Sequence, residues 1–219
     1  KGETLGIVGE SGCGKSTTAR LIMQIIKPDL GEILFDGKSL KDTKIGYVFQ
    51  NVGLFPHLSV AENIALPLKL ERRRDPARVD ALLDTVELPR ALGRRMPAEL
   101  SGGQRQRVGV ARALATDPGL LLMDEPFGAL DPVTRDTLGQ TIARLQRARG
   151  LTVLMVTHDM AEALLDAERV LVMEHGRIAA DTTPAALMRG EGGDTAQALV
   201  AVPRAQAERI AALAQGGPR

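Results

Sequence analysis

The hydrophobic positions of this chain follow two patterns that alternate along its length. Short apolar runs are typical of strands buried in a parallel sheet, and apolar residues three or four positions apart are typical of helices. Strands are predicted at Thr4–Val8, Glu32–Phe35, Ile45–Phe49, Gly119–Met123 and Thr152–Val156, with a closing hairpin of Arg169–Met173 and Arg177–Ala180. Helices are predicted at Ser16–Ile26, Val60–Leu66, Val79–Val86, 108–115, Val133–Arg149, Pro184–Met188 and Pro203–Leu213. This alternation predicts an α/β fold with a mostly parallel sheet.

The middle of the chain differs in pattern from its two ends. Residues 51–115 carry helical patterns and no strand pattern, whereas the predicted strands lie in residues 1–50 and 116–219. We therefore expect one domain, 1–219, in which an α-helical subdomain interrupts an α/β core. The charged run 71–76 is interpreted as a solvated loop rather than a binding patch. Near the C-terminus, Gly190–Gly193 predicts a flexible joint, and Gly216–Arg219 predicts a disordered tail.

Composition excludes some classes of function. The 219 residues include 28 basic and 27 acidic side chains, so the net charge of +1 gives no electrostatic case for a nucleic-acid partner. No run approaches the ~18 consecutive apolar residues of a membrane span, and no signal peptide precedes the first strand. We expect a soluble chain whose membrane role, if it has one, comes through a partner. The single cysteine, Cys13, fits a reducing compartment.

The strongest chemical motif lies between the first strand and the first helix. Residues 9–16 read Gly-Glu-Ser-Gly-Cys-Gly-Lys-Ser, which matches G-x-x-x-x-G-K-[ST]. Glycines let backbone N–H groups face an anion, and the helix N-terminus adds positive charge. Lys15 can reach terminal phosphates, and the Ser16 hydroxyl can bind Mg²⁺. The motif predicts a P-loop NTPase core of the RecA-like type, although alone it fits a kinase or a GTPase equally. Cys13 is either a redox-sensitive thiol or, more simply, a small residue filling the loop.

Polar side chains follow three of the predicted strands. Asp124 and Glu125 end a buried apolar run, where two unpaired carboxylates are unfavourable unless they are used. Mg²⁺ for one and water activation for the other would explain both. Gln50 ends another strand, either in solvent or in the phosphate site. His158 is either a second phosphate contact or an ordinary loop histidine, and its neighbours favour the first.

A second helix start is suited to an anion. Ser101 is a good N-cap, and the Gly102-Gly103 pair after it permits another group to approach closely. Asp131 likewise occupies an N-cap position, with Pro132 at the first helical position. The chain thus offers two anion-ready helix starts, one after Gly14 and one after Ser101.

Taken in order, these motifs resemble the ATP-binding subunit of ATP-binding-cassette (ABC) transporters. Gly9–Ser16 resembles its Walker A motif, Gln50 its Q-loop, Leu100–Gln104 its signature, Leu120–Glu125 its Walker B motif, Ala129–Asp131 its D-loop and His158 its H-loop. The sequence Leu-Ser-Gly-Gly-Gln between Q-loop and Walker B is highly specific for this family. The resemblance runs from Lys1 to about Leu213.

The resemblance implies an ATP site shared between two copies of the chain stacked head to tail. One copy would contribute Gly9, Glu10, Ser11, Gly12, Cys13, Gly14, Lys15, Ser16 and Thr17, and the other Ser101, Gly102, Gly103 and Gln104, with Asp131 at the dimer interface. Lys15 would hold the β- and γ-phosphates, and Ser16, Gln50 and Asp124 would order Mg²⁺. Glu125 would polarise the attacking water, and His158 would contact the γ-phosphate. Lys15, Gln50, Glu125 and His158 are therefore the expected catalytic set.

The resemblance also implies partners. The helical subdomain and the apolar turn Leu54–His57 would contact a transmembrane permease at the cytoplasmic face of the plasma membrane, and a substrate-binding protein would act indirectly. Ile45–Gln50 and Val52–Ile64 resemble bacterial importers of osmoprotectants such as glycine betaine, choline or carnitine. The alternatives are an importer of polyamines, molybdate or amino acids, an ABC-type ATPase outside transport, and a module that binds ATP without hydrolysing it.

Two features depart from the family pattern. The family normally begins with a strand, an adenine-stacking aromatic residue and a further strand before the position of Lys1, so we expect N-terminal strands to be missing and assign no base-stacking residue. The segment Lys38–Lys44 also looks shorter than usual. Neither departure touches the catalytic set.

Overall fold

The computed structural model describes residues 1–50, 52–128 and 130–214, and its centre is a six-stranded sheet. The strands are β1 (Thr4–Gly9), β4 (Ile45–Val48), β5 (Leu120–Asp124), β6 (Thr152–Thr157), β7 (Arg169–Glu174) and β8 (Arg177–Thr182). They lie in the order β4-β5-β6-β1-β7-β8, and all neighbours are parallel except β7 and β8. A separate short hairpin joins β2 (Leu34–Phe35) to β3 (Lys38–Ser39). The predicted α/β fold with a mostly parallel sheet is confirmed.

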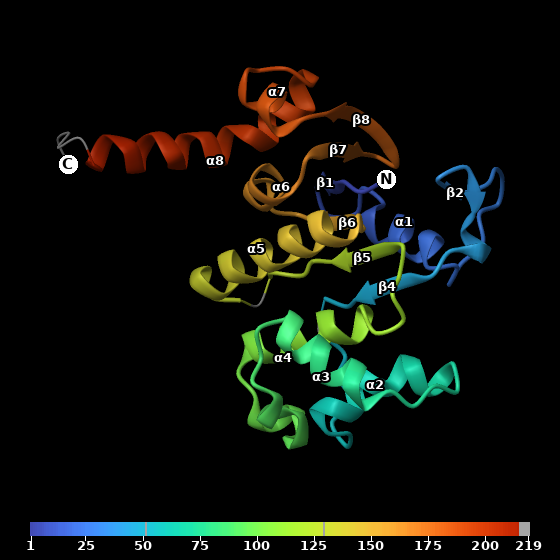
Figure 1. Ribbon diagram of the computed structural model, residues 1–219. Coiled ribbons are helices and arrows are strands. Elements are labelled where there is room, and N and C mark those ends of the chain that lie inside the picture. The colour runs from blue at the N-terminus through green and yellow to red at the C-terminus, as the bar shows by residue number, and fades with distance from the viewer. Residues whose placement is uncertain (51, 129, 215–219) are drawn as a thin grey trace.

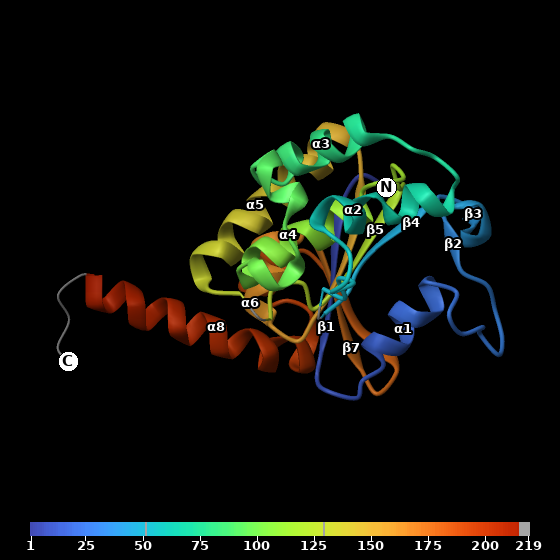
Figure 2. The same ribbon diagram turned by 90° about the horizontal axis from the view of Figure 1, so that it is seen from below.

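Helices cover both faces of this sheet (Figure 2). α1 (Lys15–Ile22) lies on one face, and α5 (Pro132–Arg149) and α6 (Met160–Asp166) lie on the other. Between β4 and β5 the chain forms α2 (Val60–Leu70), α3 (Pro76–Thr85) and α4 (Gly102–Ala113), which group together beside the β4 edge (Figure 1). Short 3₁₀ segments occur at Leu40–Asp42, Arg90–Arg94 and Pro97–Glu99. The helical insertion is thus present, and its expected bounds at 51 and 115 stay a prediction, residue 51 being outside the described residues.

The alternation of side chains along β5 shows why its sequence is apolar throughout. Leu121 and Met123 pack into the core shared with α2–α5, whereas Leu120 and Leu122 pack into the core shared with α1. All four side chains are buried. A strand buried on both faces needs no polar side, so its hydrophobic pattern shows no alternation.

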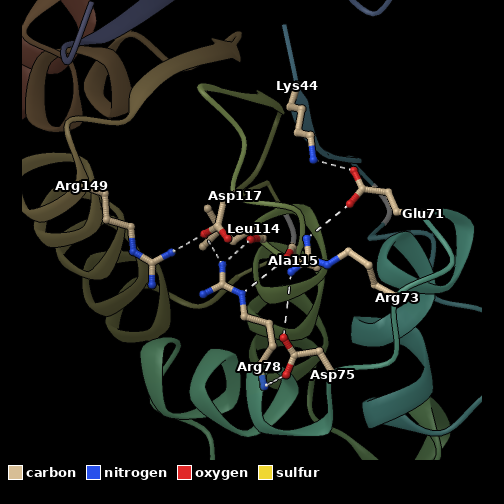
Figure 3. A network of polar contacts seen from close by, with 9 residues as sticks. All are labelled: Lys44, Glu71, Arg73, Asp75, Arg78, Leu114, Ala115, Asp117 and Arg149. Carbon is tan, nitrogen blue, oxygen red and sulfur yellow. Dashed lines mark hydrogen bonds and ion pairs between the residues drawn. The ribbon is translucent and has the colours of Figure 1, made fainter.

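A network of polar contacts links the helical insertion to the end of the sheet at which β4 and β5 begin (Figure 3). Arg78 of α3 donates to the carbonyls of Leu114 and Ala115 at the end of α4, and it pairs with Asp117. Arg149, at the end of α5, lies 3.6 Å from the same Asp117 carboxylate. Because the last carbonyls of a helix lack internal partners, Arg78 supplies donors that α4 needs.

The charged run after α2 takes part in this network. Glu71 pairs with Lys44 at 2.7 Å and with Arg73 at 3.4 Å, and Asp75 caps α3 by accepting from the backbone N–H of Arg78 at 2.9 Å. These side chains are partly exposed, and exposed ion pairs of this kind contribute only about 0–1 kcal/mol each. The run is therefore a solvated loop with local pairing, as its composition predicts.

The C-terminal part of the fold differs most from the sequence prediction. The last helix, α8, spans Gly193–Ala214 and follows α7 (Pro184–Met188), so the predicted start at Pro203 is wrong. Ala196 and Val200 are fully buried against the body of the protein, which stabilises the turns before Pro203 despite its missing N–H. The second half of α8 is exposed and extends away from the body (Figure 1). The tail 216–219 lies outside the described residues.

Smaller differences concern three other segments. α1 ends at Ile22 rather than Ile26, and Gln24 has a φ of 58° in the turn that follows. α6 has no counterpart among the predicted helices. The turn Leu54–His57, expected to contact a partner, is only partly exposed: Leu54 is half-buried against the core, while Phe55 is 43% exposed. Across the described part of the chain, no helix has the combined length and apolarity required to span a bilayer.

Asp166, at the end of α6, gives a prediction for stability. Its carboxylate occupies the space beside Gly139 of α5 and accepts no hydrogen bond from the described residues. Burial, followed by the charges of Glu162 and Asp136, raises the pKa of Asp166 to about 6, while Arg135 opposes the rise. Because the folded-state pKa exceeds the unfolded one, ionised Asp166 destabilises the fold, and this penalty grows as pH rises from about 4 to above 6.

The Asp166→Asn variant is expected to raise the free energy of unfolding by about 1–3 kcal/mol at pH 8 and to leave it nearly unchanged at pH 4.5. Urea unfolding of both proteins at the two pH values measures this difference. Exposed Asp29→Asn is the matched control and should change neither value. A gain of equal size at both pH values would show that ionisation of Asp166 is not its cause.

Candidate nucleotide-binding site

The loop between β1 and α1 is shaped by glycines. Gly14 is the N-cap of α1 with a φ of 109°, a left-handed conformation that glycine adopts without strain. At Gly9 a side chain has no room, because a Cβ would lie 2.3 Å from the Met173 carbonyl oxygen and 2.7 Å from Cys13 Sγ. Cys13 itself is buried in the core. Its burial favours the filling role over a reactive thiol.

The side chain of Lys15 forms hydrogen bonds with backbone carbonyls of the same loop. Its ammonium donates to the carbonyls of Gly9 at 2.6 Å and Glu10 at 2.9 Å, and it lies 3.8 Å from Cys13 Sγ. The side chain is 7% exposed. Next to it, Ser16 and Thr17 are exposed at the first turn of α1. A buried ammonium and free backbone donors at a helix N-terminus together make a site for an anion.

A cavity of about 600 Å³ opens over the loop. Its walls bring together segments far apart in the sequence: Gly9, Glu10, Ser11, Gly12, Gly14, Lys15, Ser16, Thr17, Glu125, His158 and Leu199. Glu125 contributes a carboxylate and His158 an imidazole to the same cavity. Leu199 belongs to α8, which therefore borders the site.

Glu125, which lines the cavity, is the centre of a polar cluster. Gln50 Nε2, beyond β4, donates to Oε2 of Glu125 at 2.5 Å. His158 Nδ1, beyond β6, lies 3.0 Å from Oε1. The backbone of Glu125 has a φ of 46°, an uncommon conformation for a residue with a side chain, and its N–H donates to Val156 O at 2.8 Å. The three side chains thus meet where adjacent parallel strands end.

Asp124 has a partner that its sequence position did not reveal. Tyr47 donates its hydroxyl proton to Oδ2 of Asp124 at 3.1 Å. Burial raises the pKa of Asp124, and the charges of Arg20 and Lys15 oppose this rise. Burial and the Asp124 charge together raise the pKa of Tyr47 to about 12, so Tyr47 remains a neutral donor.

The start of α4 lies away from this cavity. Ser101 Oγ accepts from the Gln104 N–H at 3.2 Å, and Gln104 Oε1 accepts from the Ser101 N–H at 3.0 Å. This reciprocal cap confirms Ser101 as the N-cap and leaves it exposed together with Gly102. A Cβ on Gly103 would lie 2.3 Å from Thr134 Cγ2, so its small size is required by the chain's own α5.

Asp131 caps α5 next to the start of α4. It accepts from the Thr134 N–H at 3.0 Å and from the Thr134 hydroxyl at 2.6 Å, and these bonds lower the pKa of the Asp131 carboxyl. None of Ser101–Gln104 or Asp131 is among the described residues that line the phosphate-loop cavity. Ala129, expected in the same turn, lies outside the described residues. One chain therefore presents two separate anion-ready surfaces.

Comparison with known proteins identifies the family. The family model described as ABC transporter matches residues 1–128, more than half of the chain. The chain belongs to the ABC transporter family. In solved structures, this family member resembles a dimeric post-hydrolysis state of the ATP-binding cassette MJ0796 bound to ADP and Pi, with a TM-score of 0.74 and 36% identity over 84% of this chain and 86% of that one.

Among characterised members of the ABC transporter family, the chain is similar to ATP-binding proteins of glycine betaine, choline and carnitine transport. It is 45% identical over 206 residues to the glycine betaine/carnitine/choline transport ATP-binding protein OpuCA of Bacillus subtilis, covering 89% of this chain and 54% of OpuCA. It is 50% identical over 198 residues to the sulfate/thiosulfate import ATP-binding protein CysA 2 of Chromobacterium violaceum, covering 86% of this chain and 53% of that protein. The chain thus spans about half the length of these two relatives.

The residues of this ABC family member fit Mg²⁺, which proteins bind through oxygen ligands. The Ser16 hydroxyl, the Gln50 amide and the Asp124 carboxylate are the available oxygen donors. Asp124 is half-buried, and the hydrogen bond that it accepts comes from the neutral hydroxyl of Tyr47, so its carboxylate would be stabilised further by a bound cation. Mg²⁺ would supply charge neutralisation and orientation for the phosphates there.

Tyr47 and Leu199 were not predicted as site residues, although Tyr47 contacts Asp124 and Leu199 lines the cavity. Tyr47 pairs in register with Leu122, and Asp124 lies two residues farther on the same face of the sheet. The alternation within predicted strands was the signal that could have indicated this contact. Arg112, which lies outside the cavity lining, donates to backbone carbonyls after Gln50. A buried arginine gives no local sequence signal for its partner.

Proposed function

We propose that this chain is the ATP-binding and ATP-hydrolysing subunit of an ABC importer. The observation that carries the proposal is that Lys15, Glu125 and His158 line one cavity, where Gln50 and His158 both contact Glu125. Lys15 and the backbone donors of the loop would bind the phosphates, and Glu125 and His158 would act beside them. Phosphoryl transfer requires positioning and charge stabilisation more than covalent participation, and this arrangement provides both.

Each side chain has a role in the proposed reaction. Lys15 leaves the carbonyls of Gly9 and Glu10 and binds the β- and γ-phosphate oxygens. Glu125 accepts a proton from the water that attacks the γ-phosphorus, and the bond to the β–γ bridging oxygen breaks. His158 holds a γ-phosphate oxygen. Ser16, Gln50 and Asp124 would provide the oxygen ligands for Mg²⁺.

The carboxylate of Glu125 contacts two side chains. Both of its carboxylate oxygens are engaged, one by Gln50 and one by His158. Each carboxylate oxygen can accept more than one hydrogen bond, so Glu125 keeps the capacity to bind the attacking water while Gln50 and His158 hold its side chain.

A second copy of the chain completes the proposed site. Ser101, Gly102, Gly103 and Gln104 of one copy would face the γ-phosphate bound by residues 9–17 of the other, with Asp131 at the interface. The separation of these surfaces within one chain supports this arrangement, as does the dimeric state of the similar MJ0796 cassette.

The transported solute and the other partners follow from similarity to named transport proteins. We place the subunit at the cytoplasmic face of the plasma membrane, bound to permease subunits and served by a substrate-binding protein. Glycine betaine, choline or carnitine is the proposed solute class, because several relatives carry those names. Sulfate is the competing candidate, because CysA 2 is 50% identical.

The test uses the natural protein complex in membranes. Affinity purification of the tagged chain is expected to bring down a multi-span permease, and the purified complex should hydrolyse Mg-ATP faster when glycine betaine and its binding protein are present. Stimulation by sulfate instead would replace the solute assignment. The absence of hydrolysis from a complex with bound permease would refute the enzymatic role.

A further inference from the structure

Arg112 is a buried cation whose polar and aromatic contacts among the described residues lie at Phe49, Val52 and Gly53. It is 7% exposed in the last turn of α4. Its two terminal nitrogens donate to the carbonyls of Val52 at 2.6 Å and Gly53 at 2.7 Å. Its Cζ lies 5.8 Å from the centre of the Phe49 ring. No carboxylate among the described residues pairs with it, so carbonyl dipoles and an aromatic face compensate this buried charge.

The segment that Arg112 binds is strained. Val52 has a φ of 56°, in the left-handed region that is rare for a β-branched residue. Such a conformation costs roughly 1–3 kcal/mol and persists only where surrounding contacts impose it. Here the Val52 side chain lies over Gly109 of α4, where an added Cβ would be 2.8 Å from Val52 Cγ1. Gly109 and Arg112 are three residues apart and therefore share a face of the helix.

The part of the chain that contains Val52 and Gly53 connects Gln50 to Phe55. At its start Gln50 donates to Glu125, and at its end Phe55 is exposed and held by Asn63, whose Oδ1 accepts from the Phe55 N–H at 2.8 Å. α4 itself begins at the exposed Ser101 cap. One helix thus carries the signature residues at its first turn and fixes the segment after Gln50 at its last turn.

We propose that Arg112 is a positioning residue. Together with the packing of Val52 against Gly109, it fixes Gln50 relative to α4, whose first turn carries the signature residues. This inference rests on the proposed function. Arg112 acts through Gln50 and touches neither nucleotide nor metal. When the guanidinium is lost, Val52 relaxes toward an unstrained conformation, and Gln50 no longer reaches the Glu125 side of the phosphate site. Nucleotide binding through residues 9–17 is unaffected.

The first test needs no catalysis. Amide hydrogen exchange of the free full-length chain compares Arg112→Gln with the wild type, and Arg107→Gln in the same helix is the control. Arg112→Gln is expected to speed exchange within residues 49–55 while leaving the phosphate loop and β5 unchanged, and Arg107→Gln should leave 49–55 unchanged. Unaltered exchange at 49–55 would overturn the proposal, and so would an equal increase throughout the chain.

The second test separates positioning from simple destabilisation. For Mg-ATP hydrolysis, Arg112→Gln is expected to lower kcat roughly 10- to 100-fold with little change in KM, because misplacement of a catalytic contact acts on turnover. Arg112→Lys should restore part of kcat, since an ammonium can reach one carbonyl. If Arg112→Gln does not fold, two other variants should show a lowered kcat with little change in KM. These are Arg112→Lys and Gly109→Ala, which disturbs the packing of Val52. A matching rise in KM with unchanged kcat would overturn the assignment. A wild type that lacks hydrolysis would refute the proposed function while leaving the exchange result interpretable.

Discussion

The Glu125→Gln variant is expected to hydrolyse Mg-ATP roughly 100- to 1,000-fold more slowly than the wild type. Glutamine keeps the size of the side chain and its capacity for hydrogen bonds with Gln50 and His158, but it cannot take a proton from water. Binding of ATP should persist, because Lys15 and the loop amides are untouched. Continuous phosphate release measures the rate, and calorimetric titration with ATP measures binding.

Glu208→Gln is the matched control, since Glu208 lies on the exposed half of α8. This variant should hydrolyse ATP at the rate of the wild type. Near-normal turnover by Glu125→Gln would remove Glu125 from the catalytic set and leave the cluster of Gln50, Glu125 and His158 without its proposed role.

The Lys15→Ala variant is expected to lose nucleotide binding, with an apparent Kd for Mg-ATP raised at least about 10- to 100-fold. Each hydrogen bond between a charged donor and a phosphate contributes about 1.5–3 kcal/mol, and Lys15 is the buried ammonium of the loop. Its removal also leaves the carbonyls of Gly9 and Glu10 without their donor. The loop should therefore be less ordered even before ATP arrives.

Equilibrium dialysis with labelled ATP measures this affinity directly. Lys41→Ala, an exposed lysine outside the site, should bind as the wild type does. An affinity of Lys15→Ala within twofold of the wild type would place the phosphates elsewhere on the molecule.

Much of the sheet could be predicted because its strands are buried on both faces. Leu120–Met123 and Thr152–Val156 read as strands from their apolar runs alone, since no solvent-facing position interrupts them. The caps at Ser101 and Asp131 were also predictable, because an N-cap is a local hydrogen bond between residues three apart.

The two elements that were not predicted correctly, α6 and the first half of α8, share a different physical cause. α6 is a helix of seven residues, too short for a clear repeat of its buried face. The first half of α8 is stabilised by packing of Ala196 and Val200 on the sheet side, which local propensity around Pro203 could not indicate. Tertiary burial decided both elements.

The residues of the site also fall into two groups, those that local sequence indicates and those that only the assembled fold brings into contact. Glu125 and His158 were expected at strand ends, and the parallel arrangement of β5 and β6 brings them together. Tyr47 depends on the register between two strands, and Arg112 depends on the path of the chain after Gln50. Such contacts arise only from the assembled fold.

Sedimentation velocity of the Glu125→Gln chain, with and without Mg-ATP, tests the shared ATP site most directly. We expect a monomer without nucleotide and a dimer with it, whereas the double variant with Ser101→Arg should bind ATP equally well yet remain monomeric. Ser59→Arg in the same background removes an equivalent capping box from α2 and should still dimerise. Dimerisation of the Ser101→Arg double variant as strong as that of its parent would contradict a site built from two copies of the chain.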